Sequence, residues 1–526
     1  MVSSQRLAHL LLAGSTALGA PTAKCTESTF TSLSLPNINI LSMTATTAQT
    51  QVIKTTNAFA PATNTSTEAC QVTITYTHLG WNDTINTWVW LPTSSWNGRF
   101  VGMGGGGWVT GQQSALGQPV SQGYAAVSTD GGHDASASTD SWALSSAGNL
   151  NWPLLQDFSA VALDEAASLG KSATRLFYGS RPKYSYWNGC STGGRQGHMM
   201  AQRFPTQYDG ILAAAPAINW DKFIPAEYWP QLVMGLLDYY PSACEVNAIT
   251  TFAITACDQL DGVKDGIISL PGQCKFEPLS VVGKKVQCSS PNGTLKISRK
   301  AAQFAAAVWA GPKDSQGRQL WYGFNHEAPL TGLGGTTCTS LNDCSPSPFP
   351  ITADWLSTIL SRNASLNLSS LTLDEFARLF RASINEFQSV LGTRDTDLTE
   401  FKSAGGKMLT WHGMKDELIY YNGTVEYYTQ LLEADPDVHD YYRFFPAPGV
   451  EHCGGGPGWY PGDSFQVLVD WVERGKAPER LRARTTPTAT KGGAVAPTRT
   501  ADLCPFPKVM TYVGGNPDRA EAFACK

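Results

Sequence analysis

The chain has 526 residues and is nearly neutral, with 38 basic and 43 acidic side chains and a formal net charge of −5. This balance, without any run of Lys or Arg, argues against nucleic acid or an anionic membrane as a partner and favours a neutral or weakly charged ligand. Charged residues make up only 15% of the chain, and its 50 glycines and 10% aromatic residues indicate a compact, loop-rich protein rather than a disordered one.

The N-terminus predicts a cleaved secretory signal over residues 1–19, because Arg6 precedes a short apolar stretch that ends in small residues. An ordinary N-terminal helix is the alternative. No later apolar stretch reaches the roughly 18–20 residues of a membrane span. Twelve cysteines, an even number, favour up to six disulfides in an oxidising compartment. N-x-Ser/Thr sequons, which are glycosylated in the secretory pathway, occur at Asn64, Asn82, Asn292, Asn363, Asn367 and Asn422. We therefore expect a secreted, extracellular protein.

Strands and helices alternate along the first part of the chain. Short β-prone runs with turns between them begin at about Val72 and continue to Asp130, where we expect the sheet to start. Residues 154–170 have helical periodicity, and residues 183–204 have the pattern of a strand, a tight glycine turn and a helix. This alternation predicts an α/β fold with a mostly parallel, doubly wound sheet.

The regular alternation stops near Pro216 and resumes near Gly405 with an apolar strand. We interpret residues 217–404 as an inserted domain, and residues 25–216 with 405–526 as the main domain. A helix, a strand over residues 441–448 and a glycine-rich loop complete the alternation. Residues 484–501 are rich in Thr, Pro, Ala and Gly, which is typical of a solvated linker.

A candidate nucleophile lies in the turn between the predicted strand and helix. Gly189 to Gly193 fit the pattern G-x-S-x-G, in which small residues flank the serine because the turn is too tight for larger side chains. An ordinary exposed serine in a glycine-rich turn is the alternative. The context of an aromatic strand before the turn and a helix after it favours Ser191 as a catalytic nucleophile.

A serine nucleophile needs a base, and the base needs a carboxylate that fixes its tautomer. In this kind of fold the acid and then the histidine follow the serine in the chain. His452 lies in a glycine-rich loop near the end of the chain and is our choice of base, with His412 as the rival. Asp416 is our choice of acid because it directly follows a predicted strand. The competitors for the acid are Glu417, Asp435, Asp437 and Asp440.

Ser191 and His452 each have a cysteine as their neighbour, Cys190 and Cys453. If these two cysteines pair, disulfide geometry holds their Cα atoms roughly 4.4–6.8 Å apart. Such a bridge would place the serine beside the histidine, and we expect it chiefly to preserve the distance between them.

The oxyanion of an ester-hydrolysis intermediate needs hydrogen-bond donors. We expect one from the amide of Thr192 and another from the cluster Gly104 to Gly107, with Gly105 and Gly106 as the chosen residues. Phosphate binding is the competing use of such a cluster, but no G-K-[ST] follows it. We expect no organic cofactor.

A carboxylate-rich loop in the insertion, residues 257–267, offers the hard oxygen ligands that Ca²⁺ prefers. It is not an EF-hand, because the twelfth position counted from Asp258 is Ser269 rather than Glu. A polar turn with capping aspartates is the alternative. The ion would be structural, because the loop is far from Ser191 in the sequence.

The segments GCSTGG, DQLDGVKDGI, HGMKD, PGVEHCGGGPG and CPFPKV together resemble the tannase/feruloyl esterase family of secreted carboxylester hydrolases. The resemblance covers nearly the whole mature chain. It implies an α/β-hydrolase fold with a lid domain inserted between the nucleophile and the acid, and a triad of Ser191, Asp416 and His452. It also implies a calcium site formed by Asp258, Asp261, Val263, Asp265 and Ile267.

The same resemblance implies four disulfides: Cys25–Cys70, Cys190–Cys453, Cys257–Cys274 and Cys504–Cys525. The partners of the remaining four cysteines stay open: Cys244, Cys288, Cys338 and Cys344.

The resemblance further implies the substrate class. Hydroxycinnamoyl esters, above all feruloyl esters of plant cell-wall polysaccharide such as xylan, come first, gallate esters of tannins come second, and terephthalate esters are a third possibility. From a different class, the chain could be a non-catalytic secreted binding protein on a hydrolase fold. The intact set of serine, acid and histidine argues against that alternative.

Overall fold

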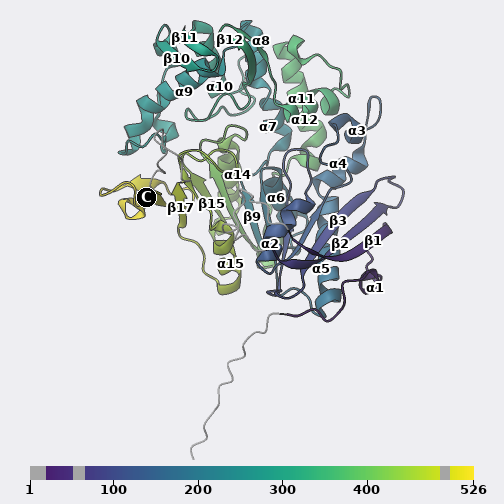
Figure 1. Ribbon diagram of the computed structural model, residues 1–526. Helices are drawn as coiled ribbons and strands as arrows, with labels where there is room; N and C mark the ends of the chain where they lie inside the picture. Colours follow the sequence, from purple (N-terminus) through teal and green to yellow (C-terminus); the bar gives the residue numbers. More distant parts are fainter. Residues whose placement is uncertain (1–18, 51–65, 486–497) are drawn as a thin grey trace, which may run out of the picture.

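The computed structural model describes residues 19–50, 66–485 and 498–526 (Figure 1). Most of the predicted signal, the sequon at Asn64 and the middle of the predicted linker lie outside these residues. Of the other sequons, Asn82, Asn292, Asn363 and Asn367 are exposed, and Asn422 is half-buried at the start of a helix. None of the helices in the described part of the chain is long and apolar enough to span a membrane.

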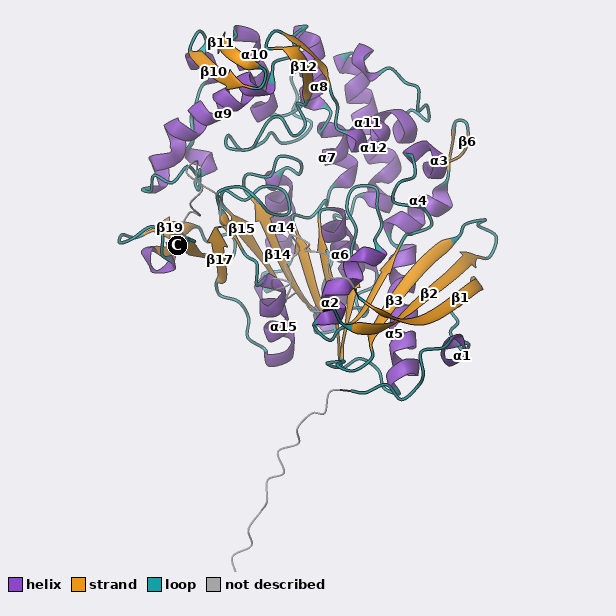
Figure 2. Cartoon of the chain, in the orientation of Figure 1, coloured by secondary structure: helices purple, strands orange, loops and turns teal. Residues whose placement is uncertain are grey.

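A nine-stranded sheet forms the centre of a mixed α/β fold (Figure 2). Its strands, in spatial order, are β1 (Ile38–Gln49), β2 (Glu68–His78), β3 (Ile85–Pro92), β5 (Ala125–Thr129), β4 (Arg99–Met103), β8 (Tyr184–Cys190), β9 (Gly210–Ala214), β14 (Lys407–Gly413) and β15 (Tyr442–Ala447). The pairings from β5 to β15 are parallel, whereas β1, β2, β3 and β5 pair antiparallel. The predicted α/β class with a mostly parallel sheet is therefore confirmed.

Two features of the sheet region differ from the prediction. The sheet begins at β1, well before Val72, because the half-exposed β1 pairs along its length with β2. The helix expected over 154–170 is divided into α4 (Trp152–Ser159) and α5 (Val161–Tyr178). The two helices are separated at Ala160, whose φ of −157° is not helical.

Helices cover both faces of the sheet, and side chains that alternate along the strands pack beneath them. In β14, Met408 faces the core that includes α5 and α14 (Tyr421–Ala434), whereas Leu409 faces the core that includes α15 (Ser464–Arg474). Both side chains are fully buried. The helix α6 (Thr192–Arg203) directly follows β8 and packs against β8 and β9. The shorter elements around this part are α1 (Glu27–Phe30), α2 (Gly117–Ser121), α3 (Thr139–Ala143), β6 (Leu144–Ser146) and β7 (Asn149–Leu150).

The residues between β9 and β14 form a separate group of elements at one end of the sheet (Figure 1). They comprise helices α7 (Trp220–Ala226), α8 (Trp229–Leu237), α9 (Ala243–Cys257), α10 (Arg299–Ala310), α11 (Pro350–Asp354), α12 (Leu373–Leu391) and α13 (Thr399–Ser403), and two hairpins, β10 (Lys285–Ser289) with β11 (Asn292–Lys296) and β12 (Thr336–Ser340) with β13 (Asp343–Pro346). Most of a large apolar core, with Trp220 and Trp355 among its buried members, comes from these elements. The division into domains stays a prediction.

All twelve cysteines are paired in six disulfides. The four predicted pairs are present, and the open cysteines form Cys244–Cys288 and Cys338–Cys344. The last bridge, Cys504–Cys525, joins the residue after β18 to β20 among the small strands near the C-terminus. These strands are β16 (Trp459–Tyr460), β17 (Leu481–Thr485), β18 (Thr500–Leu503), β19 (Met510–Tyr512) and β20 (Phe523–Cys525).

Leu409→Ala tests the packing of the sheet. We expect this change to lower the free energy of unfolding by about 2–5 kcal/mol, because it leaves a cavity beneath a helix. Leu41→Ala, the same change at a side chain of β1 that is 52% exposed, is the matched control and should cost less than about 0.5 kcal/mol. Urea unfolding followed by tryptophan fluorescence measures both. Equal midpoints for the two variants would contradict this assignment of the core.

Candidate active site

Ser191 lies in a sharp turn between β8 and α6. Its φ of 63° and ψ of −125° are rare for a residue with a side chain. The turn brings two main-chain segments together so closely that a Cβ at Gly189 would lie 2.4 Å from the main chain of Gly193. The predicted strand, turn and helix are therefore present. This geometry holds Ser191 at the end of a parallel strand, where α/β folds place their reactive groups.

Asp416 follows β14 and is fully buried, with donors on both carboxylate oxygens. Its Oδ2 accepts from Nδ1 of His452 at 2.8 Å and lies 3.1 Å from Nε2 of His412. Its Oδ1 accepts the amides of Leu418 at 2.9 Å and Ile419 at 2.8 Å. Burial alone would raise the pKa of Asp416, but the two imidazoles hold it well below its usual value. Asp416 is therefore an ionised partner for a histidine.

His452 lies in the loop after β15, and its side chain is 13% exposed. Burial alone would lower its pKa, but the charge of Asp416 and the hydrogen bond between them raise it above the usual value for histidine. The contact from Nδ1 to Asp416 leaves Nε2 as the nitrogen that can take a proton from a nucleophile. The amide of His452 also donates to Oε2 of Glu417 at 3.1 Å, which fixes the start of the loop.

The structure separates the rival residues from these roles. His412 is fully buried, with Nδ1 at 2.9 Å from the hydroxyl of Thr424 and Nε2 on Asp416, so both ring nitrogens are engaged. Glu417 contacts the main chain of the histidine loop rather than the ring. Asp435 pairs with Lys402 at 3.0 Å, away from the histidine. Sequence reasoning kept His412 as a competing base and missed its contact with the acid, which the spacing of four residues could have suggested.

The disulfide between Cys190 and Cys453 joins the end of β8 to the histidine loop, with the two Cα atoms 5.9 Å apart. Ser191 and His452 are the direct neighbours of these cysteines in the chain. The bridge therefore brings the turn that carries the serine to the loop that carries the histidine.

The glycine cluster after β4 lies against the start of α6. The hydroxyl of Thr192 donates to the carbonyl of Gly107 at 2.8 Å. The amide of Gly105 donates to Oε1 of Gln196 at 3.1 Å, and the amide of Gly106 donates to the carbonyl of Val109 at 3.0 Å. Both chosen amides thus have acceptors within the protein, because the cluster folds into a hydrogen-bonded turn. The next amide, that of Gly107, has no acceptor among the described residues.

The predicted calcium loop is compact and partly buried. Oδ1 of Asp258 accepts the amides of Asp265 and Gly266, both at 2.9 Å. Burial raises the pKa of Asp265 to about 6, against the effect of Arg499, whose guanidinium is 3.3 Å from its Oδ2. Clustered carboxylates with one oxygen fixed by amides suit a hard cation. Asp258, Asp261 and Asp265 do not all approach within 4.8 Å of one another in the described structure, so the loop would have to draw them closer for all three to bind one ion.

The calcium loop packs against the histidine loop. A Cβ at Gly449 would lie 2.9 Å from the side chain of Ile267. The guanidinium of Arg499, which contacts Asp265, also donates to the carbonyl of Pro457 at 3.1 Å. The two loops are therefore coupled mechanically, although they are far apart in the sequence.

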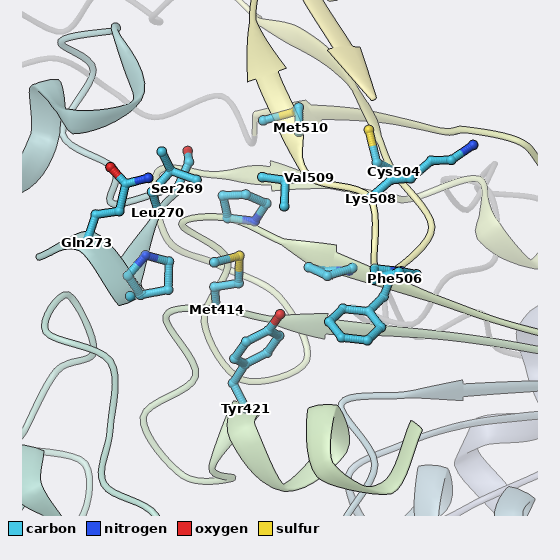
Figure 3. Close-up of a pocket in the computed structure, with 15 residues that line it drawn as sticks. Ser269, Leu270, Gln273, Met414, Tyr421, Cys504, Phe506, Lys508, Val509 and Met510 are labelled. Atoms are coloured by element: carbon cyan, nitrogen blue, oxygen red, sulfur yellow. The ribbon is translucent and has the colours of Figure 1, made fainter. Parts of the chain in front are cut away.

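A cavity of about 240 Å³ lies beside these loops, between Leu270, Met414, Tyr421 and Phe506 (Figure 3). Ser191, Asp416 and His452 do not line it. Its lining is mainly apolar and comes from the segment after the calcium loop, the segments that follow β14, the end of β15 and the C-terminal tail. It is therefore distinct from the candidate active site.

Comparisons with known proteins identify the family of the chain. The family model described as tannase and feruloyl esterase matches residues 70–526. A probable feruloyl esterase from Arthroderma benhamiae is 39% identical over 473 residues, which cover 88% of this chain and 86% of that protein.

Two solved structures are similar over almost their whole length. Tannin acyl hydrolase from Aspergillus niger has a TM-score of 0.85 at 27% identity and covers 97% of this chain and 96% of its own. Feruloyl esterase B from Aspergillus oryzae has a TM-score of 0.75 at 25% identity, with 94% of this chain and 98% of its own covered. Since the match extends over nearly the entire sequence and the entire fold, the chain belongs to the tannase and feruloyl esterase family.

Proposed function

We propose that this protein is a secreted serine carboxylesterase that hydrolyses phenolic-acid esters, with feruloyl esters as the preferred class. The observation that carries the proposal is the pair of His452 with buried Asp416, on a loop that a disulfide ties to the turn of Ser191. The relatives named feruloyl esterase and tannase support an ester as the substrate. The finer description of the fold as an α/β-hydrolase with an inserted lid is part of this proposal.

In the first half-reaction, Nε2 of His452 takes the hydroxyl proton of Ser191 while Oγ attacks the ester carbonyl carbon. Asp416 stabilises the imidazolium that forms, because its charge faces Nδ1 at 2.8 Å. The imidazolium then gives its proton to the departing alcohol oxygen, and an acyl-enzyme remains. Water attacks the acyl carbon with the same base, the bond to Oγ breaks, and Ser191 recovers its proton as the acid leaves.

The oxyanion of each tetrahedral intermediate needs amide donors. The amide of Thr192 is suited to this role, since the first amides of a helix have no partner within the helix. For the second donor we propose the amide of Gly107, which has no acceptor among the described residues, in place of those of Gly105 and Gly106, which already donate within the protein. The contact between Thr192 and Gly107 would hold the two donors together.

We further propose that residues 217–404 act as a lid that supplies the slot for the aromatic acid. The segment contacts the surroundings of the site, for example at Gly107 and Met414. A Cβ at Gly107 would lie 2.9 Å from the side chain of Ile351, and the amide group of Asn325 donates to the carbonyl of Met414 at 2.8 Å. These contacts place the insertion beside the glycine cluster and the turn that carries Asp416, where a lid would meet the aromatic acid. Gallate esters are the second candidate substrates, because of the high TM-score with a tannin acyl hydrolase.

The carboxylate-rich loop is proposed to hold one Ca²⁺ through Asp258, Asp261 and Asp265 and the carbonyls of Val263 and Ile267. The ion supplies positive charge to three clustered carboxylates and so stabilises the loop. Through Arg499 and Gly449 the loop supports the segment that carries His452.

Ser191→Ala tests the nucleophile. We expect kcat/KM for methyl ferulate to fall at least about 1,000-fold, because the remaining groups cannot form an acyl-enzyme. Ser114→Ala, at an exposed serine, is the matched control and should retain full activity. A Ser191→Ala variant that is properly folded by circular dichroism and still hydrolyses the ester at the original rate would refute the mechanism.

The substrate class is tested by the rates with methyl ferulate, methyl caffeate and methyl gallate. We expect the two hydroxycinnamates to have the higher kcat/KM, because the relative at 39% identity is named a feruloyl esterase. A preference for gallate would instead assign the protein to the tannase type. No activity of the wild type on any aryl ester would favour the binding-protein alternative.

Asp416→Asn tests the charge beneath the histidine through the pH profile. The base works in its neutral form, so kcat/KM falls as the pH decreases through the pKa of His452, which Asp416 raises. Removal of the charge should lower this pKa and shift the acidic limb of the profile to lower pH, and the plateau should fall by roughly 10⁴. An acidic limb that does not move would show that Asp416 does not control the base.

Chelation tests the calcium loop. We expect EDTA to lower the melting temperature and added Ca²⁺ to restore it. A ligand that binds only the folded state stabilises it by about 2.7 kcal/mol when its free concentration is about 100 times its Kd. Asp258→Asn should remove this response, and Asp437→Asn, at a side chain that is 72% exposed, should keep it. A wild-type melting temperature that is indifferent to both treatments would count against a calcium site.

A further inference from the structure

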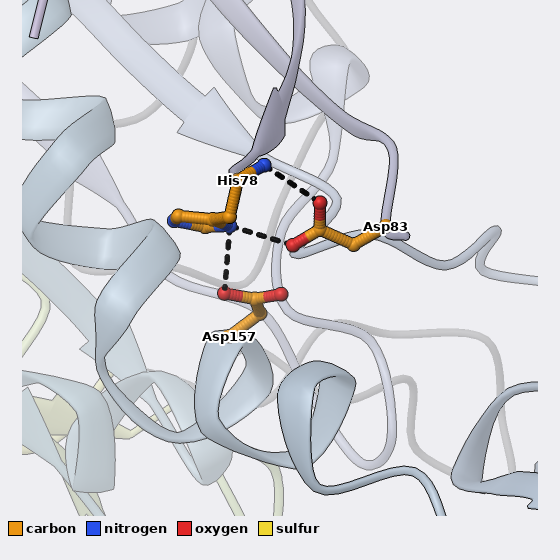
Figure 4. A group of neighbouring side chains, drawn as sticks. All are labelled: His78, Asp83 and Asp157. Atoms are coloured by element: carbon orange, nitrogen blue, oxygen red, sulfur yellow. Dashed lines mark hydrogen bonds and ion pairs between the residues drawn. The ribbon is translucent and has the colours of Figure 1, made fainter. Parts of the chain in front are cut away.

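A second cluster of ionisable side chains lies away from the proposed active site, at the end of β2 (Figure 4). His78 is the last residue of β2, Asp83 is in the turn that follows, and Asp157 is in α4. All three residues are buried, with exposed fractions of 7%, 7% and 0%. One ligand atom from each lies within 4.8 Å of the other two.

The imidazole of His78 is oriented from both sides. Its Nδ1 is 2.6 Å from Oδ2 of Asp83 and 3.9 Å from Oδ1 of Asp157. Its Nε2 is 2.7 Å from Oε1 of Glu165, a residue of α5 whose other oxygen accepts from the hydroxyl of Tyr76 at 2.8 Å. A histidine that binds a metal through one ring nitrogen usually donates a hydrogen bond from the N–H of the other nitrogen to a carboxylate in this way.

The remaining contacts leave ligand atoms directed into the cluster. Oδ1 of Asp83 accepts the amide of His78 at 2.8 Å and the hydroxyl of Thr77 at 2.9 Å, so Oδ2 is the oxygen that faces the imidazole. Asp157 has no exposed surface, and neither of its carboxylate oxygens has a hydrogen-bond partner. Figure 4 shows this carboxylate facing His78 and Asp83. Its one ion-pair contact among the described residues is the 3.9 Å approach to Nδ1 of His78, and a buried carboxylate that accepts no hydrogen bond is costly.

We propose that His78, Asp83 and Asp157 bind a divalent transition-metal cation of the Zn²⁺ type through Nδ1, Oδ2 and Oδ1. The site is separate from the calcium loop and from Ser191. A mixed set of one imidazole and two carboxylates suits Zn²⁺ better than Ca²⁺, which takes oxygen ligands.

The dimensions of the cluster suit such an ion. Zinc lies about 2.0–2.2 Å from imidazole and carboxylate ligands, so any two ligand atoms are at most about 4.4 Å apart. The 3.9 Å between Nδ1 and Asp157 is within this span, and the 2.6 Å to Asp83 widens when the ion replaces the shared proton. The ion would also give the carboxylate of Asp157 a direct ligand contact in place of the hydrogen bonds that it lacks.

A metal here would connect three parts of the fold. It would join the end of β2 and its turn to α4, which is itself tied to the helix that follows Ser191. The guanidinium of Arg195, in α6, donates to the carbonyls of Phe158 and Ser159, both at 3.1 Å. The role we assign to the ion is therefore structural.

The test uses the full mature chain without an affinity tag, loaded with Zn²⁺, dialysed against buffer and analysed for metal by mass spectrometry. We expect wild type to retain one equivalent of Zn²⁺ and Asp157→Asn to retain none. Glu165→Gln removes only the negative charge that faces Nε2 of His78. This variant should bind Zn²⁺ about 10–100-fold more weakly than wild type. Asp258→Asn is the control, because it alters only the calcium loop and should retain the zinc.

Melting temperatures distinguish zinc binding from the alternative that the cluster binds no metal and Asp157 is protonated. If Zn²⁺ binds, it should raise the melting temperature of wild type but not that of Asp157→Asn. If Asp157 is simply protonated, Asp157→Asn should melt at or above the wild-type temperature with or without zinc, and wild type should retain no metal. Either of these last results would overturn the proposal. If Asp157→Asn does not fold, the same two measurements are made on His78→Gln, which should retain no zinc. A zinc chelator should then lower the melting temperature of zinc-loaded wild type.

Discussion

A carboxylate without exposed surface stays charged only where donors surround it, and Asp416 meets this condition with two imidazoles and two amides. The donors come from the end of β14, from the turn that follows it and from the histidine loop. Asp416 thus stays ionised only when these three segments are packed in their native positions. This constraint explains why His412, which cannot act as a base, is still placed against the acid.

The same segments are held from outside by contacts of quite different kinds. A disulfide fixes the histidine loop to the serine turn, Glu417 fixes the amide of His452, and Arg499 connects the loop to the carboxylate-rich segment. Each contact restrains the main chain rather than the imidazole itself. The ring can therefore stay free to exchange a proton at Nε2 while its position is maintained.

Much of this arrangement could be predicted from the sequence, because it depends on local patterns. The strand, turn and helix around Ser191 follow from G-x-S-x-G, and the position of Asp416 follows from the apolar strand before it. The missed features depend on contacts between distant segments. The strand β1 mixes apolar residues with Thr, Ser and Asn and is recognised as part of the sheet by its pairing with β2, and the amides of Gly105 and Gly106 are engaged by a side chain and a turn that no spacing rule reveals.

The connectivity of the disulfides has a consequence for the synthesis of the protein. Six cysteines lie between Cys190 and Cys453, and they pair only among themselves: Cys244–Cys288, Cys257–Cys274 and Cys338–Cys344. During synthesis, the thiol of Cys190 must therefore stay unpaired until all six of these cysteines and then Cys453 have been made. Formation of the bridge beside Ser191 completes only when the C-terminal part of the sheet has arrived. A partly synthesised chain that has already formed the three bridges of this segment would still lack the one that brings serine and histidine together, so the two halves of the site are joined only after Cys453 has been made.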